Sequence, residues 1–272
     1  MKEDLKPKDI VAPDFGDSPE FPIMPLRNTV LFPQQVIPIY IGREKSLHLI
    51  GDLDQTNKYI VVVAQEDGSI EDPGKKDLYA YGTLAHVLKV FDMPDNSKSA
   101  IVQGISRVKI LDYTMEKPYY KAVVNQLDES ESGDDLELDA LANNLRQTFS
   151  DLIKIAPNLT DEHTGMLSNI QKPNRLADRA ISLMTLTNPE KQEILEELDV
   201  KVRLDKSIKT ISREMQRIKL GEEIQTEVHD EIAKTQREYY LREQLKAIKK
   251  ELGEDEGSVE LKELEDKIKK RS

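Results

Sequence analysis

The stretch YAYGTLAHVLKVFDMPDNSKSAIVQGISRVKILDY, residues 79–113, decides the fold of the first half of the chain. It holds β-rich runs at 79–91, 99–102 and 107–113. Between the first two runs lies MPDNS at 93–97, in which proline presets φ and asparagine tolerates a left-handed backbone. We therefore predict a β-hairpin with its tip at 93–97 and strands that project outward.

Similar short β-rich runs, broken by Pro, Gly, Asn and Asp, lie on both sides of this stretch. They predict an antiparallel β lobe over residues 21–128, with one helix at 45–53, where the apolar residues fall on one broad face. Residues 1–20 carry acids and prolines and lack the apolar run of a signal peptide, so they predict a disordered arm. Further strands are predicted at 21–26, 36–41, 59–64 and 119–127.

The hydrophobic period changes from two towards three and a half after the β lobe, so residues 134–200 are predicted to form a small helical bundle. Pro157 ends the first of its helices, and Thr160 caps the second. Pro173 begins the third. Asn188 is predicted as the N-cap of the fourth, with proline at the first helical position.

Residues 201–252 predict a long charged helix, followed by an acidic linker and the start of a further helix at 253–272. The apolar residues of the long helix step by four and three, the heptad pattern of a coiled coil. The pattern slips in the middle of the helix and then resumes. Its first part either pairs between subunits or packs on the bundle of 134–200. The predicted assembly seam consists of Ile208, Ile211, Met215, Ile218, Leu241, Leu245 and Ile248.

The composition of the 272 residues is 38% hydrophobic, 33% charged and 5% aromatic, which favours either two cores or one compact unit with an extended element. No cysteine is present, so disulfides and thiolate metal sites are excluded and a reducing cytoplasm is expected. A net charge of -12 disfavours nucleic acid as a partner. No apolar stretch approaches the roughly 20 residues of a membrane-spanning helix.

The sequence also offers no recognisable site for chemistry. His48, His86, His163 and His229 lack the spacing of a metal motif such as HExxH. The interval from Gly68 to Gly74 is one residue too long for a phosphate loop, and no GxSxG elbow is present. We therefore predict no catalytic, cofactor-binding or metal-binding residues in this chain.

Several segments, in the same order, resemble the N-terminal domain of the ATP-dependent protease Lon, of the bacterial type. In the β lobe they are FPIMPLRNTVLFP (21–33), IYIGREKSL (39–47), VAQEDG (63–68), DLYAYGTLAHVLKV (77–90) and VQGISRVKI (102–110). Further on, RLADRAISLMTLTNPEKQEILEELDVKVRL (175–204) and QREYYLREQLKAIKKELGE (236–254) are similar to the helical lobe and long helix of that family. The resemblance covers nearly the whole chain and implies an α+β fold with a PUA-like β lobe.

The resemblance also implies a function. In that family an ATPase module and a Ser-Lys protease module follow the long helix, so this chain resembles a truncated form that is not itself an enzyme. The complete protein would be a cytoplasmic, homohexameric serine protease, dependent on ATP and Mg²⁺, that degrades misfolded, damaged and some regulatory proteins. This part would select unfolded substrates and organise the hexamer.

We expect the β lobe to bind exposed apolar segments through a hydrophobic groove or a free strand edge. For Leu31, Phe32 and Ile101, packing in the core is favoured over a role in binding. Met93, at a turn and with a flexible thioether, is the better exposed contact. The candidate contacts are Leu26, Leu31, Phe32, Pro38, Met93 and Ile101.

Two alternatives belong to other functional classes. A free-standing scaffold or adaptor would share only the β lobe, which the sequence beyond Lys201 argues against. RNA binding is suggested by PUA-like folds, but the acidic charge and the lack of a basic aromatic stripe oppose it. The basic cluster at 267–271 is best interpreted as a solvated helix end.

Overall fold

The computed structural model describes residues 13, 19–53, 58–130, 132–252 and 267. The predicted arm at 1–20 and the predicted linker at 253–272 therefore lie almost wholly outside the described residues. The chain divides into two compact units, Met1–Met215 and Gln216–Ser272.

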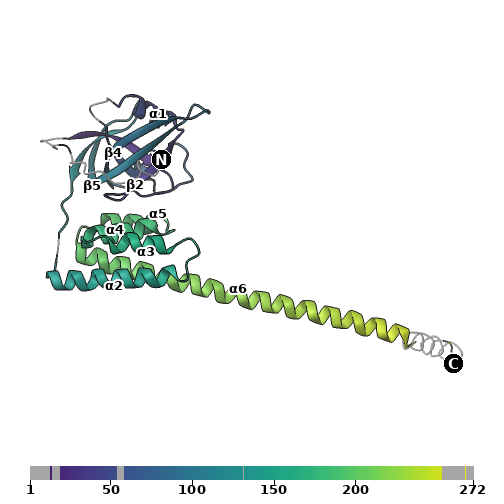
Figure 1. Cartoon of the computed structure of the whole chain (residues 1–272). Helices are drawn as coiled ribbons and strands as arrows, with labels where there is room; N and C mark the ends of the chain where they lie inside the picture. The colour runs from purple at the N-terminus through teal and green to yellow at the C-terminus, as the bar shows by residue number, and fades with distance from the viewer. Residues whose placement is uncertain (1–12, 14–18, 54–57, 131, 253–266, 268–272) are drawn as a thin grey trace. The chain divides into compact units, whose positions relative to one another are not determined.

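The first unit begins with a six-stranded sheet in the order β2-β5-β4-β3-β1-β6. Figure 1 labels β2, β4 and β5 of this sheet. The long strand β5 also pairs with β6, so the sheet closes on itself and leaves β2 at an edge. The elements are β1 (Glu20–Leu26), β2 (Val36–Ile41), α1 (Glu44–Gly51), β3 (Tyr59–Ala64), η2 (Lys75–Asp77), β4 (Tyr81–Asp92), β5 (Lys98–Met115) and β6 (Lys121–Gln126).

Two features of the sheet differ from the prediction. β1 pairs with β3 in parallel, whereas the other pairs are antiparallel as expected. The chain between β1 and β3 carries β2 and α1, and a long crossover of this kind is what a parallel pair requires. The runs predicted at 99–102 and 107–113 are one strand, β5, because pairing with β4 continues through Gly104 and Ser106.

Strand β3 is buried on both faces, which explains its continuous apolar run YIVVVA. Ile60 and Val62 belong to a core cluster that also holds Leu49 of α1. Val61 and Val63 belong to a second cluster, because alternate residues of a strand point to opposite faces.

The loop between β1 and β2 is fixed to the middle of the sheet by short hydrogen bonds. The Thr83 hydroxyl donates to the Leu31 carbonyl at 2.6 Å. Gln34 N donates to Gly104 O at 2.9 Å, and Gly104 N donates to Gln35 O at 2.9 Å. A side chain cannot be accommodated at Gly104, because a Cβ there would lie 2.2 Å from the Phe32 carbonyl oxygen. This close approach explains a glycine in the middle of a long strand.

The helical lobe follows the sheet, and the capping residues set its boundaries. Thr160 caps α3 as predicted, in a capping box with His163. The prediction of Asn188 as the cap of α5 is wrong, because Thr187 and Glu190 form the capping box instead. The Asn188 amide donates to the Arg27 carbonyl at 2.9 Å. The helices are α2 (Asp135–Ile153), α3 (Asp161–Ser168), α4 (Pro173–Leu183), α5 (Asn188–Glu196) and α6 (Val200–Glu251).

α6 has two environments along its length. Its first turns are packed in the first unit, with Leu204 and Ile211 fully buried. The apolar residues of its later turns are exposed, from Leu220 onward. Among the helices that the structure describes, none combines the length and the hydropathy needed to span a bilayer.

Candidate functional site

An exposed apolar surface lies beside the β4–β5 hairpin. Tyr40 on β2, Ser99 on β5 and Phe91 on β4 are directly opposite one another, so they form one row on one face of the sheet. Pro38 lies two residues before Tyr40 and shares that face. The Tyr40 side chain is 67% exposed, and that of Met93 at the hairpin tip is 41% exposed. We define Pro38, Tyr40, Phe91 and Met93 as the hairpin patch.

The hairpin tip is held in one conformation by its own hydrogen bonds. Met93 N donates to Ser97 O at 3.0 Å, and Ser97 N donates to Asp95 Oδ1 at 3.1 Å. The hydrogen bonds from the Ser97 hydroxyl and amide lower the pKa of Asp95. The Tyr40 hydroxyl donates to Asp95 Oδ2 at 3.1 Å, which ties β2 to the tip. The turn therefore presents Met93 and Tyr40 together.

The open edge of β2 accepts a further strand only in part. Gln35 O accepts from Gly104 N of β5, and backbone groups alternate in direction along a strand. The backbone groups of Val36, Pro38 and Tyr40 therefore face the open edge. Pro38 has no N–H to donate, so the edge offers donors only at Val36 and Tyr40. This arrangement limits strand addition and gives side-chain contacts the larger role.

A groove of about 710 Å³ continues from Tyr40 towards the start of α1. Pro25 and Tyr40 supply its accessible apolar surface, above the buried Met24, Leu26 and Ile41. Arg27 and Arg43 line its charged part. Burial, together with the neighbouring Arg27, lowers the pKa of Arg43. The Arg43 guanidinium donates to Gln65 Oε1 at 2.6 Å. We call this the α1 groove. It has room for an apolar side chain of a bound polypeptide, with polar groups beside it for the main chain of that polypeptide.

The predicted contact residues separate into two groups. Leu26, Leu31, Phe32 and Ile101 are buried, so packing in the core accounts for their places and they are not available as surface contacts. Leu26 alone among them lines the α1 groove. Pro38 and Met93 are exposed. Prediction from sequence missed Tyr40, although its signal was present: in β2 the even-numbered residues alternate with the inward Ile39 and Ile41.

Three buried charged side chains and the partly buried Glu129 form an ion-pair network between the sheet and the helical lobe. Arg107 of β5 donates two hydrogen bonds to Asp178 of α4, at 2.6 and 2.9 Å. Glu129 lies 2.7 Å from Arg107 Nη1 and 2.9 Å from Arg203 Nη2 of α6. Two cations face two carboxylates, so the network is neutral, as buried charges require. It joins β5, α4 and α6.

Acidification weakens this network. Burial raises the pKa of Glu129, but Arg203, Arg107 and the Asn174 amide together outweigh that effect, so the pKa lies below its ordinary value. A carboxylate with a lowered folded-state pKa stabilises the fold above its unfolded pKa. That stabilisation is lost as the pH falls through the folded pKa.

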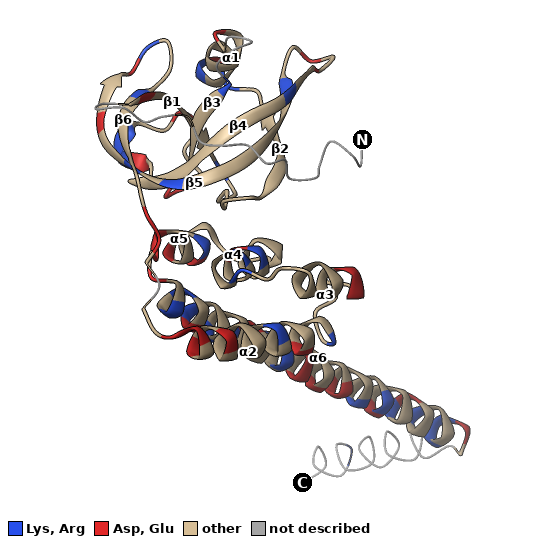
Figure 2. Cartoon of the chain, turned by 60° about the vertical axis from the view of Figure 1, so that its left-hand side comes forward, with Lys and Arg blue, Asp and Glu red and all other residues tan. Residues whose placement is uncertain are grey.

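The predicted assembly seam lies along α6, where basic and acidic residues are interspersed (Figure 2). Ile211 is buried in the first unit, and Ile208, Met215 and Ile218 are partly buried. Packing within the chain therefore accounts for much of the first part of the seam. Leu241, Leu245 and Ile248 are exposed.

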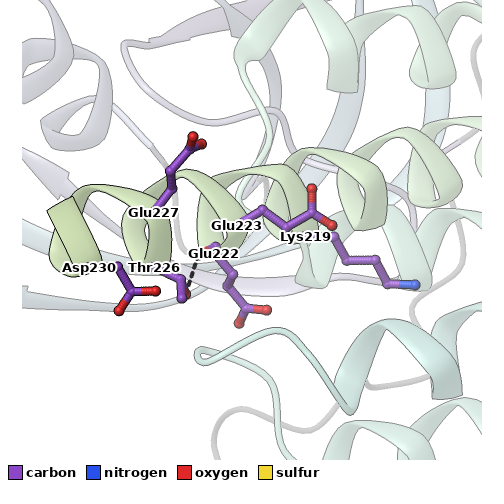
Figure 3. Close-up of a pocket in the computed structure, with 6 residues that line it drawn as sticks. All are labelled: Lys219, Glu222, Glu223, Thr226, Glu227 and Asp230. Carbon is purple, nitrogen blue, oxygen red and sulfur yellow. Dashed lines mark hydrogen bonds between the residues drawn. The ribbon is translucent and has the colours of Figure 1, made fainter.

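Acidic side chains also gather on α6. Figure 3 shows Glu222, Glu223, Glu227 and Asp230 with Lys219 and Thr226, whose hydroxyl donates to the Glu222 carbonyl at 2.9 Å. All six belong to one helix and are exposed, so they do not enclose a ligand site. In the part of the chain that the structure describes, no group of three or more His, Asp or Glu side chains is placed to hold a metal ion.

Comparisons with known proteins agree on one family. Residues 20–213 match the family described as the ATP-dependent protease La (LON) substrate-binding domain. The chain is 42% identical over 257 residues to a Lon protease of Koribacter versatilis, covering 94% of this chain and 31% of that protein. It is 40% identical over 254 residues to a Lon protease of Dictyoglomus thermophilum, covering 93% of this chain and 32% of that protein. The chain thus spans about a third of the length of these relatives.

Solved structures show the same fold. The N-terminal domain of a Lon protease of the Mycobacterium avium complex has a TM-score of 0.56 and 21% identity, covering 71% of this chain and 98% of that chain. A Lon N-terminal domain protein of Xanthomonas campestris has a TM-score of 0.50 and 19% identity, covering 68% of this chain and 95% of that chain.

Proposed function

This chain belongs to the family of the ATP-dependent protease La (LON) substrate-binding domain, and from that premise we propose that its hairpin patch binds exposed apolar segments of unfolded polypeptides. The observation that carries the proposal is the exposure of Tyr40 and Met93 on a hydrogen-bonded hairpin next to the α1 groove. Side chains this apolar are normally buried, and an exposed group of them marks an interaction surface.

Contacts of this kind suit the selection of unfolded proteins. Burial of apolar area is non-directional, at roughly 25 cal/mol per Å², so it does not demand one sequence. A folded protein hides the side chains that the patch would contact, whereas an unfolded chain exposes many. The thioether of Met93 adapts to different partners, and the Tyr40 ring adds a rigid apolar surface. The α1 groove would hold the next side chain of the bound segment.

For the whole protein we propose an ATP-dependent serine protease of the cytoplasm that works on misfolded, damaged and some regulatory proteins. ATP and Mg²⁺ are proposed for that whole protein, and we assign neither to residues of this chain. The support is the similarity to Lon proteases over 94% and 93% of this chain.

The binding proposal predicts a difference between two states of one protein. A protein kept unfolded by substitution should bind the chain, and its native counterpart should not. Met93→Asp should weaken binding of the unfolded form about fivefold or more, because a carboxylate then faces the apolar segment. Fluorescence anisotropy measures both affinities. Leu111→Asp, the same apolar-to-aspartate change at an exposed position of β5 outside the patch, is the matched control. Equal binding of the two states would contradict the proposal.

We also propose that the exposed turns of α6 pair between subunits through Leu241, Leu245 and Ile248, and so help to organise a homohexamer. The three side chains are exposed and spaced by four and three residues, as in a coiled-coil seam. The middle residues Leu220, Ile224, Val228 and Ile232 step only by four, so the stripe drifts around the helix there.

This second proposal predicts that the average mass of the chain rises with concentration in light scattering. Leu241→Glu with Leu245→Glu should abolish the rise, because charges then occupy the seam. Lys246→Gln with Lys250→Gln makes the same change in net charge away from the seam and should preserve it. A chain that stays monomeric at high concentration would exclude self-pairing of these residues in this chain.

A further inference from the structure

A cavity of about 680 Å³ lies between the loop that joins β1 to β2 and the helices α3 and α4. Its size falls within the roughly 300–1,000 Å³ of protein ligand pockets. Val36 and Ile170 supply apolar surface, above the fully buried Phe32, and Asn169 supplies an amide. Arg175 and Arg179 of α4 line the same cavity.

The two arginines share one face of α4, because they are four residues apart. Neither forms an ion pair with any carboxylate among the residues that the structure describes. Arg179 is partly buried, and within the described part of the chain its guanidinium has one hydrogen-bond partner, the Met166 thioether at 3.5 Å from Nη2, which is a weak acceptor. Burial lowers the pKa of Arg179. The cavity therefore holds a guanidinium without a protein counter-ion.

This contrasts with the other buried arginines of the same unit. Arg107 and Arg203 are each paired with Asp178 and Glu129. Asp178 also reaches the cavity wall, but its carboxylate oxygens are engaged by Arg107. Withdrawing a charged group from water without a partner is unfavourable. An anion from outside would supply the missing partner to Arg179.

The wall opposite the arginines is rigid before any ligand arrives. Gln34 has φ of 62°, the left-handed region that is uncommon for a residue with a side chain. Its N–H bonds to Gly104 O, and Phe32 N donates to the Gln35 side chain at 3.0 Å. A fixed wall lowers the entropy that binding must overcome.

We propose that this cavity binds a carboxylate side chain in an acidic segment of a polypeptide substrate, through Arg175 and Arg179, while an apolar neighbour of that carboxylate packs on Val36 and Ile170. The inference rests on the proposed function and adds a preferred substrate class: segments that combine Asp or Glu with apolar residues. A guanidinium matches a carboxylate with two parallel hydrogen bonds. The chain as a whole has a net charge of -12 and repels acidic segments at long range. The attraction to such a segment therefore comes only from the arginines at the cavity.

The test uses a fluorescent peptide of alternating Glu and Leu and its counterpart with Gln for Glu. The acidic peptide should bind the chain about tenfold tighter than the Gln peptide. Arg175→Gln with Arg179→Gln should remove that difference. Arg242→Gln, on the exposed part of α6, should leave it unchanged. Equal affinities of the two peptides for the unaltered chain would overturn the proposal.

Two further measurements separate peptide binding in this cavity from a role of the arginines in folding and from simple anion binding. The double variant should unfold at the same or a higher urea concentration, because it removes a guanidinium that lacks a partner. A lower midpoint would show that the arginines serve the fold, and would overturn the proposal. Inorganic phosphate is the second probe: phosphate binding without binding of the acidic peptide would overturn the assignment to polypeptide.

Failure of the cavity proposal can also be distinguished from failure of the proposed function of the hairpin patch. A neutral unfolded protein should bind the double variant as well as it binds the unaltered chain, but should lose affinity for the Met93→Asp variant. If Met93→Asp has no effect on affinity and the double variant still binds the acidic peptide more weakly, the proposal for the cavity is supported and the proposal for the hairpin patch is contradicted.

Discussion

Asp178→Asn is expected to lower the free energy of unfolding by about 3–5 kcal/mol, the range found when one partner of a buried ion pair is removed. Asp178 is almost fully buried and receives two hydrogen bonds from Arg107. Without its charge, two buried guanidinium groups share the single carboxylate of Glu129. Urea denaturation followed by circular dichroism measures the loss.

Two controls make this expectation specific. Asp139→Asn removes the same charge from the exposed surface of α2 and should change the free energy of unfolding by less than about 0.5 kcal/mol. Arg107→Met combined with Asp178→Leu removes both partners and should be less destabilising than Asp178→Asn alone, because no unpaired charge is created between them. A loss below about 1 kcal/mol for Asp178→Asn would show that the junction tolerates an unpaired guanidinium.

Gly104→Ala is expected to destabilise the β lobe by about 3 kcal/mol or more, at the upper end of the range for overpacking. The new Cβ would lie 2.2 Å from the Phe32 carbonyl oxygen and 3.1 Å from Thr83 Cγ2. Neither side can move easily, because Gly104 pairs within the sheet and the loop at Phe32 is bonded to Thr83 and Gly104. The free energy of unfolding in urea is the quantity to compare.

Gly165→Ala is the matched control for that substitution. Gly165 lies within α3, and a Cβ there meets nothing within 4 Å. Alanine is favoured over glycine in a helix by up to about 1 kcal/mol, so this variant should be equal to or more stable than the unaltered chain. If Gly104→Ala were equally neutral, the close contact with Phe32 would not be a constraint on the fold.

Much of the fold follows from local signals. The bounds of β2 and β3 agree with the prediction, because turn residues flank both runs. Thr160 and Pro173 mark helix starts for local reasons too. What the sequence does not reveal depends on distant partners. The parallel pairing of β1 with β3 and the continuity of β5 through Gly104 depend on contacts across the sheet.

The candidate site likewise has parts that local sequence signals predict and parts that depend on distant residues. A turn predicts the exposure of Met93. The alternation in β2 places Tyr40 on the face opposite Ile39 and Ile41, but alternation alone does not say whether another element covers that face. For Leu31 and Phe32 the sequence favours packing in the core over a contact with substrate, and both side chains are buried. Arg107 looks like an ordinary strand residue, because its partners Glu129 and Asp178 are 22 and 71 residues away in the sequence.

The most direct test of the central claim is amide hydrogen exchange of the chain with and without an unfolded polypeptide. If the hairpin patch is the binding surface, the added polypeptide should slow exchange at the open-edge amides Val36 and Tyr40 and in residues 91–99. Residues 161–168, in α3, should be unaffected by a neutral polypeptide. Slowed exchange elsewhere in the β lobe, with no change at Val36, Tyr40 and 91–99, would contradict the account.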